Sequence, residues 1–342
     1  MCDNPIIMSY PKPLSRETLE RRYSETGLSK EQLSFLELFF SSCANLYRAI
    51  PIIEAWDVYK RIKDEKPRLH RKDLLNYGAV AQRDQLPFYV LEESELYLDG
   101  EKGINRSHIV NRQLVGKGTS RYDMVYNLLD VQRSWPYNVP ENFIGNAISV
   151  PSAEEISLLD FLGSLKVTED EIESWGIKRK VENKGKRLGE IRTLSRIEQS
   201  IIDYEKRPSF KEYYINLFSG TVSERLFREF KLDLNIGFTP FSKIIEHLFD
   251  QIYEYGVSVS DKDFEALSGM LMEFNNKTRL WFNCGWAPWE RSRYLHENGL
   301  VSEGLRRISM GPGMKAHFKE HPEEYEEFLK ATKAMGIEIV DE

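Results

Sequence analysis

The chain has 342 residues, more than one hydrophobic core usually serves, so about two domains are expected. Hydrophobic residues make up 41% and charged residues 30% of the chain, which excludes global disorder. The net charge of -7 excludes a protein coated in nucleic acid, but it leaves room for a local basic patch. The sequence contains neither a long apolar run nor a recognisable signal peptide, so we expect a cytoplasmic chain that enters no membrane.

The first part of the chain is predicted to be helical. Residues 1–28 are polar with early prolines, which indicates an arm that lies on the first domain. A capping box at Ser29, followed by apolar residues at helical spacing, predicts a helix from 29 to about 50. Proline suits a first helical turn, so a second helix is expected to begin at Pro51, and a third covers about 70–85.

The pattern changes after the third helix. Between residues 88 and 115, short runs of aromatic and branched residues separated by turn signals predict two or three small strands. Three helices followed by a β-ribbon is the order of a winged helix, so residues 29–116 are predicted to form a winged-helix-like domain. Residues 117–150 are expected to connect this domain to the rest of the chain through one helix, at about 122–132, and an irregular segment.

From residue 151 the strand signals nearly vanish, and a helical domain is predicted over 151–342. Capping boxes at Ser152 and Thr168 indicate two helix starts. Two later helices carry strong apolar stripes, and the stripe of the second begins at Phe264 and is expected to close at Trp281. Further helices are predicted over about 188–205, 209–231 and 325–335. The fold is therefore predicted to be mainly α.

The predicted second and third helices carry a surplus of positive charge. Between Lys60 and Arg83 there are eight Lys and Arg against three Asp and Glu. Such a surface can lie on phosphates while the third helix enters a major groove. The candidate nucleic-acid-binding residues are Lys60, Arg61, Lys63, Arg68, Arg71, Lys72 and Arg83. The alternative interpretation is a solvated helix pair, and winged helices also serve as protein-docking modules.

A second candidate site is the segment 276–290, which joins the end of an apolar helix to a new helix at Pro288. Its three tryptophans fall within nine residues, so they can bury a large area or form a stacking surface beside a cation. The residues of this aromatic corner are Arg279, Trp281, Trp286 and Trp289. The favoured interpretation is a structural corner locked by aromatic packing, and a recognition surface is the alternative.

Three short motifs stand out in the sequence. They are Asn276-x-Thr278-Arg279-x-Trp281-x-Asn283-x-Gly285-x-x-Pro288-x-Glu290, Asn45-Leu46-Tyr47-x-x-Ile50-Pro51 leading into Trp56-x-x-Tyr59, and Tyr137-x-x-Pro140 after Gln132. Together they resemble a group of uncharacterised bacterial proteins common in clostridia, many of which end in a zinc-binding SEC-C motif. This chain lacks such a tail, and Trp286-Ala287 stands where the group has His-Thr, so the resemblance implies no zinc site and no activity here.

Patterns typical of catalysis or metal binding are missing from the sequence. The three cysteines, Cys2, Cys43 and Cys284, lie far apart, which gives neither a disulfide framework nor the spacing of a zinc site. The six histidines include no His-Glu-x-x-His arrangement, and the chain has no phosphate loop or dinucleotide fingerprint. We therefore expect no catalytic residues, no metal and no cofactor.

Two classes of function remain open. The favoured one is a non-catalytic binding or regulatory protein whose basic helices contact duplex nucleic acid. Alternatives within this class are a protein partner, or an inhibitor connected with phage or defence that acts through the helical domain. The second class is an enzyme whose site is assembled from scattered residues that spacing cannot reveal. The sequence does not indicate an oligomeric state.

Overall fold

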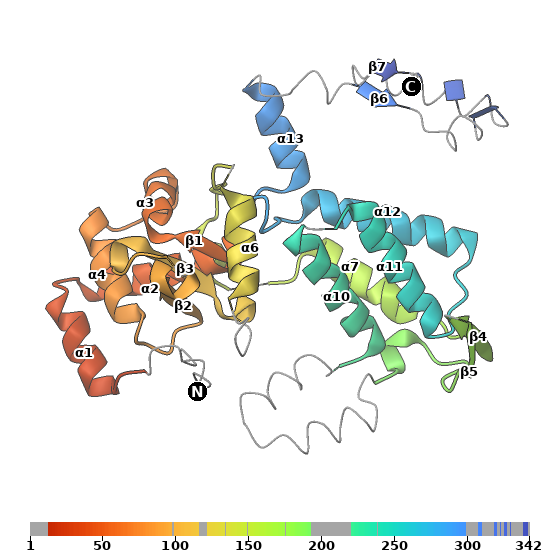
Figure 1. Cartoon of the computed structure of the whole chain (residues 1–342), viewed down its shortest axis with the longest axis horizontal. Helices are drawn as coiled ribbons and strands as arrows, with labels where there is room; N and C mark the ends of the chain where they lie inside the picture. Colours follow the sequence, from red (N-terminus) through yellow and green to blue (C-terminus); the bar gives the residue numbers. More distant parts are fainter. Residues whose placement is uncertain are drawn as a thin grey trace, which may run out of the picture. The chain divides into compact units, whose positions relative to one another are not determined.

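A computed structural model describes residues 13–97, 99–115, 122–133, 135–148, 150–174, 176–192, 220–237, 239–298, 307–309, 318–319, 322, 325–326, 329 and 338–340. The chain divides into two compact units, Met1–Pro288 and Trp289–Glu342. The first unit is mainly helical and contains a small antiparallel sheet (Figure 1). This agrees with the predicted helical class and with the small strands expected between residues 88 and 115.

The elements of the first unit follow one another in a simple order. Its α-helices are α1 (Arg16–Glu25), α2 (Lys30–Tyr47), α3 (Ile52–Arg61), α4 (Arg71–Ala81), α5 (Glu93–Leu96), α6 (Asp123–Gln132), α7 (Ala153–Ser164), α10 (Val222–Ile236), α11 (Phe241–Glu254) and α12 (Asp261–Lys277). Its strands are β1 (Ala49–Pro51), β2 (Phe88–Glu92), β3 (Ser107–Asn111), β4 (Glu171–Ser174) and β5 (Ile177–Lys180). Short 3-10 turns are η1 (Ile104–Arg106), η2 (Arg112–Leu114), η3 (Ile144–Ala147) and η4 (Leu188–Glu190).

The second unit holds α13 (Pro288–Glu297), apart from its first residue, and the parallel strand pair β6 (Arg307–Ser309) and β7 (Glu338–Val340). Within this unit, the guanidinium of Arg293 lies 4.9 Å from the ring centre of Trp289. The helix predicted over 325–335 falls mostly outside the described residues.

The central sheet of the first unit has the strand order β1-β3-β2 and is antiparallel. In the middle strand, Ile109 pairs with Ile50 of β1 and with Val90 of β2. Side chains alternate along a strand, so these three residues share one face, while His108 and Val110 point to the other. All five residues of β3 are buried, which means that both faces of the sheet are covered.

The two faces of the sheet belong to two different cores. On the Ile109 face, α2 packs against β1 and β3 and contributes the aromatic rings of Phe39, Phe40 and Tyr47. On the opposite face, α6 covers the sheet together with a tryptophan from far along the chain. The buried residues of this second core are Ala49, Leu91, Val110, Leu114, Val125, Leu128, Leu129 and Trp281.

A third core is formed mainly by the helices α7, α10, α11 and α12, with further buried residues from η4 and the neighbouring loops. Helix α12 buries Leu267, Leu271 and Phe274, which recur at helical spacing along one face. Helix α11 does the same with Ile244 and Leu248. The stripe predicted for α11 is confirmed, and the stripe predicted for α12 is confirmed from Leu267 to Phe274.

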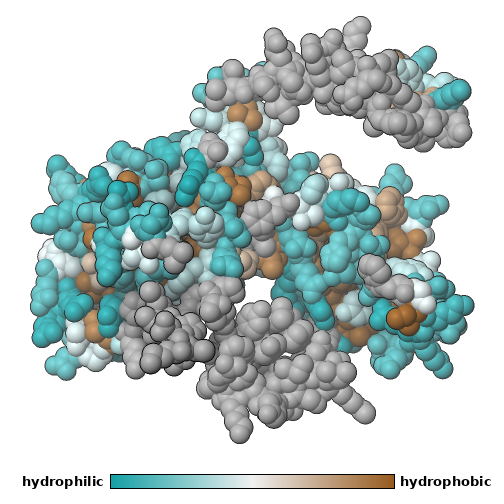
Figure 2. Space-filling model, viewed as in Figure 1, coloured by the Kyte–Doolittle hydropathy of each residue, from teal (hydrophilic) through white to brown (hydrophobic). Residues whose placement is uncertain are grey.

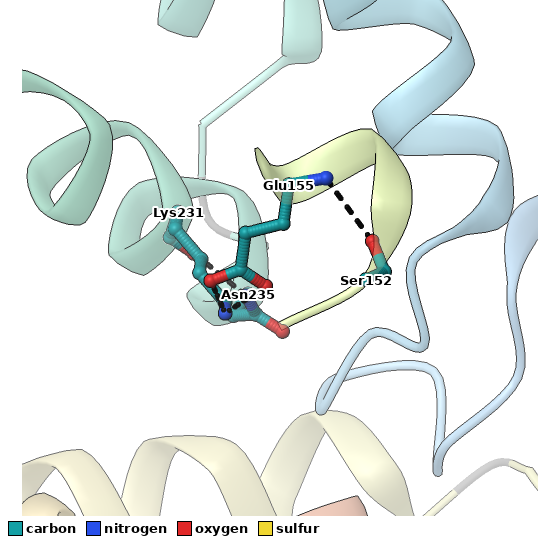
Figure 3. Close-up of polar contacts among 4 residues, drawn as sticks. All are labelled: Ser152, Glu155, Lys231 and Asn235. Atoms are coloured by element: carbon teal, nitrogen blue, oxygen red, sulfur yellow. Dashed lines mark hydrogen bonds and ion pairs between the residues drawn. The ribbon is translucent and has the colours of Figure 1, made fainter. Parts of the chain in front are cut away.

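A half-buried ion pair joins α7 to α10 (Figure 3). The ammonium of Lys231 lies 2.7 and 2.8 Å from the two carboxylate oxygens of Glu155. The backbone N–H of Glu155 donates to the hydroxyl of Ser152, which caps α7, and the amide of Asn235 donates to the Lys231 carbonyl. The Glu155 side chain is only 18% exposed, so water screens this pair less than an ion pair at the surface.

The helix starts predicted at Ser29, Pro51 and Ser152 are confirmed. Ser29 forms the expected capping box, because the Gln32 backbone N–H donates to its hydroxyl and its own N–H donates to the Gln32 side chain. Pro51 precedes the first turn of α3, and the Ser152 hydroxyl caps α7. The arm contains a helix that the sequence did not reveal: α1 packs on α4, with the ring centres of Tyr23 and Tyr77 5.9 Å apart.

The first predicted helix ends earlier than expected. It was predicted to reach about residue 50, but α2 stops at Tyr47 and residues 49–51 form β1. Arg48 adopts a φ of 61°, which breaks the helix. The following three residues then pair with β3, a partner more than fifty residues later in the sequence, so local spacing could not predict the strand.

The predicted helix start at Thr168 is wrong, and strands occur after residue 151, where the strand signals of the sequence nearly vanish. In the described part of the chain, the four short strands β4 to β7 follow that residue. Strands β4 and β5 form a hairpin in which Glu171 lies opposite Lys180, and Gly176 turns with a φ of +74°. Ile172 of this hairpin is buried between the exposed Glu171 and Glu173, which fits the alternation of a strand rather than a helical stripe.

The helix predicted over 188–205 falls mostly outside the described residues, and so does the first part, 209–219, of the helix predicted over 209–231. Inside them, 188–190 form η4, and α10 begins at Val222.

Candidate functional site

Most of the predicted nucleic-acid-binding residues form one exposed row. The exposed members are Lys60, Arg61, Lys63, Arg68, Arg71 and Lys72. They run from the last turn of α3 through the following loop to the first turn of α4. Arg83 is half-buried and lies in the turn after the other end of α4, where its carbonyl accepts the Leu14 N–H at 3.0 Å. The structure therefore does not bring Arg83 together with the other six.

The ion pairs within this basic row are weak. Lys60 contacts Asp57, and the ammonium of Lys63 lies 3.4 Å from a carboxylate oxygen of Glu141. The side chains of both pairs are at least half exposed, and exposed ion pairs contribute about 0–1 kcal/mol. Both lysines are therefore able to exchange a carboxylate for another anion at little cost.

Lys66 belongs to the same stretch but has a structural task. Its ammonium donates to the carbonyls of Tyr59 at 2.7 Å and Ile62 at 2.8 Å, at the end of α3. It also lies 4.9 Å from the centre of the Tyr59 ring. A cation at a helix C-terminus stabilises the last carbonyls, so Lys66 caps α3.

Trp281 of the aromatic corner is structural. Helix α12 ends at Lys277 and Thr278 is extended, so the apolar stripe of α12 does not continue to Trp281 as predicted. Phe264, at the predicted start of that stripe, is 52% exposed. Trp281 instead packs in the core beneath α6, 8% exposed, with the guanidinium of Arg48 4.2 Å from the centre of its ring.

The other corner residues play separate parts. The indole N–H of Trp286 donates to the Pro136 carbonyl at 2.8 Å, and the Arg279 guanidinium donates to the Gly285 carbonyl at 3.1 Å. Trp289 belongs to the second unit and is 46% exposed.

A buried glutamine links the corner to α2. The side-chain amide of Gln132 donates to the carbonyls of Tyr47 at 2.9 Å and Trp281 at 2.7 Å. Its oxygen accepts the hydroxyl of Tyr137 at 3.4 Å. Gln132 is 1% exposed, and all three contacts are shielded from water. The three motifs that the sequence singled out separately therefore meet around this one side chain.

The corner is fixed by a second set of hydrogen bonds nearby. The backbone N–H of Asn138 donates to the Cys284 carbonyl at 2.9 Å, and its side-chain amide donates to the Gly285 carbonyl at 3.3 Å. The Tyr47 hydroxyl donates to the Asn138 carbonyl at 2.5 Å. Cys284 is fully buried in the core on the α2 side, and its φ of 52° places it in the left-handed region. The segment around Cys284 thus closes a core whose other residues come from the first half of the chain.

A pocket of about 530 Å³ lies beside the end of α6. It is bounded by residues of five segments: the start of α3, α5 and the residue after it, β3, the last turn of α6, and residues 135–137. The polar and aromatic groups that matter on its wall are Glu54, Glu93, Tyr97, His108, Arg133 and Trp135. None of these was predicted as a site residue.

His108 is the unusual member of this wall. It lies in the central strand and is 8% exposed, and its Nδ1 is buried without a hydrogen-bond partner. Burial and, to a smaller extent, the nearby positive charge of Arg133 lower the pKa of His108 to about 4. The ring is therefore uncharged at neutral pH. In the sequence, His108 could be noticed only as a histidine within a predicted strand. No other potential ligand or catalytic residue lies near it at the spacing of a known motif, so it was not predicted as a site residue.

The described part of the chain has no group of three His, Cys, Asp or Glu side chains placed to hold a metal ion. Among the same residues, no helix combines the length and apolar character needed to cross a membrane. Figure 2 shows hydrophobic residues scattered among hydrophilic ones on the face in view. The basic row and the pocket are therefore the two candidate functional sites of the described residues.

No protein-family model, curated protein or solved structure matches this chain. The resemblance to the clostridial group stays a prediction.

Proposed function

We propose that residues 29–116 bind duplex nucleic acid, chiefly through its phosphates. The observation that carries this proposal is the exposed row of six basic side chains from the end of α3 to the first turn of α4. Phosphate contacts supply most of the affinity of non-specific binding and need such a cluster. The net charge of the whole chain is negative, so we expect weak binding confined to this surface.

The order of the elements supports the same interpretation. The chain runs α2-β1-α3-α4-β2-β3, and β3 lies between β1 and β2. We interpret this as a winged-helix-like arrangement, in which α3 and α4 correspond to the helix pair that docks on a duplex and α4 to the helix that enters the major groove.

Helix α4 has a face suited to that task. Arg71 and Lys72 are exposed in its first turn, where the positive end of the helix dipole also favours phosphate. Asn76 and Ala79 follow Lys72 on one face, and Asn76 is half exposed. An asparagine amide can read the edge of an adenine, whereas the opposite face is buried around Tyr77.

Fluorescence anisotropy with a labelled duplex of about 20 base pairs tests the proposal. If all six residues neutralise phosphates, affinity should fall roughly a thousandfold between about 50 and 200 mM salt. The double variant Arg71→Glu/Lys72→Glu should abolish binding. Lys178→Glu/Lys180→Glu makes the same charge change on the exposed strand β5 and serves as the matched control.

Three results would contradict the proposal: no binding at the lower salt concentration, equal loss of binding in both double variants, or binding that the α4 variant leaves unchanged. Equal loss would mean that net charge alone drives association. Unchanged binding would place the interface elsewhere in the protein.

A further inference from the structure

We propose that the pocket beside the end of α6 binds a small organic cation, a molecule that carries a primary ammonium or guanidinium group on a short aliphatic or aromatic body. This proposal stands apart from nucleic-acid binding. The pocket volume of about 530 Å³ falls in the usual range of small-molecule sites. Three features of its wall favour such a ligand: the negative charge, the imidazole of His108 and the aromatic rings.

The positive charge on the wall has a partner within the protein. Among the described residues, Arg133 is the only cation that lines this pocket, and its guanidinium lies 3.5 Å from a carboxylate oxygen of Asp130. The hydroxyl of Tyr97 also interacts with it. Both side chains of the ion pair are more than 60% exposed, so the pair is weak, and an anionic ligand is the competing occupant that the binding experiment must exclude.

The negative charge on the wall is not balanced. Glu54 forms no ion pair within the described part of the chain, and Glu93 accepts only a long hydrogen bond of 3.3 Å, from the Glu101 backbone N–H. Two carboxylates therefore face the pocket without a counter-ion. A ligand ammonium or guanidinium would supply one through charge-assisted hydrogen bonds.

The end of α6 adds to the negative potential. Leu129 and Gln132, in the last turn of the helix, line the pocket. The last carbonyls of a helix carry a partial negative charge, and the basic residue next to them, the C-cap Arg133, already has Asp130 as a partner. A cation in the pocket would lie against the favourable end of the helix dipole.

His108 supplies the polar group that the protein itself leaves unused. The residue is almost wholly buried, and the Nδ1 of its imidazole has no hydrogen-bond partner among the described residues. Because the ring is uncharged, it does not repel a cation and offers a lone pair to a ligand N–H. A buried polar group without a partner is costly, so an aliphatic residue would be the better choice here if the position were purely structural.

Aromatic rings complete the wall. Trp135, Tyr137 and Tyr97 line the pocket. Aromatic faces attract organic cations and pack well against an apolar body. This combination of carboxylates, a neutral imidazole and aromatic rings would bind an inorganic cation less well, because the described residues offer no ligand cluster for a metal.

Isothermal titration calorimetry on the full chain tests the proposal. The probes are tyramine and agmatine, which carry an ammonium and a guanidinium, together with N-acetyltyramine and 3-(4-hydroxyphenyl)propionate, which share the tyramine body but are neutral and anionic. We expect saturable binding of at least one amine, and binding of the neutral analogue at least about tenfold weaker, as the loss of a charge-assisted contact implies.

Variants assign this binding to the pocket. Glu54→Gln should weaken amine binding at least about tenfold, since it removes a carboxylate from an exposed position without disturbing the core. Glu65→Gln removes a similar exposed carboxylate away from the pocket and should leave the dissociation constant unchanged. His108→Gln should also weaken binding, with its melting temperature recorded to separate this loss from unfolding.

Four outcomes would overturn the proposal. They are the absence of saturable binding of either amine below about 10 mM, equal affinity for N-acetyltyramine, tighter binding of the anionic analogue, and an unchanged affinity in Glu54→Gln. Tighter binding of the anion would instead assign the pocket to Arg133.

Discussion

Around the three-stranded sheet, buried polar side chains join segments far apart in the sequence, whereas helices α7, α10, α11 and α12 pack through apolar stripes. The single side chain of Gln132 connects α6 to Tyr47 and to Trp281, which lies 149 residues after Gln132. In the helical core the comparable polar contact, between Lys231 and Glu155, lies at the margin and keeps access to water.

This difference decides how each region responds to substitution. A buried group that loses its partner around the sheet stays buried, and it then bears the full cost of desolvation. A group at the margin of the helical core can turn to water instead. We therefore expect single substitutions near the sheet to cost more than those among the helices.

The largest expected effect is that of Trp281→Ala. It empties a buried aromatic site and removes the ring beneath the Arg48 guanidinium, so unfolding free energy should fall by about 3–5 kcal/mol. Chemical denaturation measures this change. Phe264→Ala removes a half-exposed ring from α12 and should cost far less. Similar costs for the two variants would contradict the comparison.

The next effect is a dependence on pH that originates at His108. The pKa of His108 is about 4 in the folded chain and about 6.5 in the unfolded chain. Between these two pH values, the unfolded state therefore binds a proton that the folded state does not bind. Stability should therefore fall on acidification between about pH 6.5 and 4, by up to about 3 kcal/mol, and should be unaffected by this group above that window.

The groups that face His108 also titrate or carry charge: Glu54, Glu93, Tyr97 and Arg133. Denaturation curves of wild type and His108→Gln, compared at each pH, isolate the histidine. The difference between their stabilities should shrink or reverse as pH falls through the window. Parallel curves for the two proteins would show that His108 does not cause the slope.

A smaller effect is expected for Gln132→Leu. The substitution keeps most of the volume but leaves the Tyr47 carbonyl without this donor and the Trp281 carbonyl with the Cys284 N–H alone, so stability should fall by about 2 kcal/mol. Glu155→Gln weakens the ion pair of the helical core and should cost about 1 kcal/mol or less. The comparison fails if Glu155→Gln proves the more damaging of the two in the same denaturation assay.

The two regions also differ in how much the sequence could predict. The helical core was readable because Ile244, Leu248, Leu267 and Leu271 repeat at the period of a helix, a local property. The strand at residues 49–51 was not, because three residues between two helices acquire their conformation from β3. The hairpin of β4 and β5 left a weak local signal, acidic residues on one strand opposite basic residues on the other.

The sites follow the same rule. The basic row could be predicted because its residues are neighbours in the sequence, so they form a charged surface as soon as their side chains are exposed. The pocket could not, since Glu54, His108 and Arg133 come from three separate elements that the sheet and α6 bring together. The motif residues around Gln132 were noticed, but their meeting depends on contacts across about half of the chain.

The segment that carries Trp281 and Cys284 has a consequence for the protein during its synthesis. Gln132 and Cys284 are 152 residues apart, so at translation rates of about 5–20 residues per second the second follows the first by roughly 8 to 30 s. During that time the sheet, α2 and α6 of the nascent chain are outside or near the ribosome. The segment that carries Trp281 and Cys284, which completes the cores on the two faces of the sheet, has not yet been made. Tyr47 and the underside of α6 would then offer apolar surface to chaperones, and a fragment that stops short of residue 279 would keep that surface open permanently.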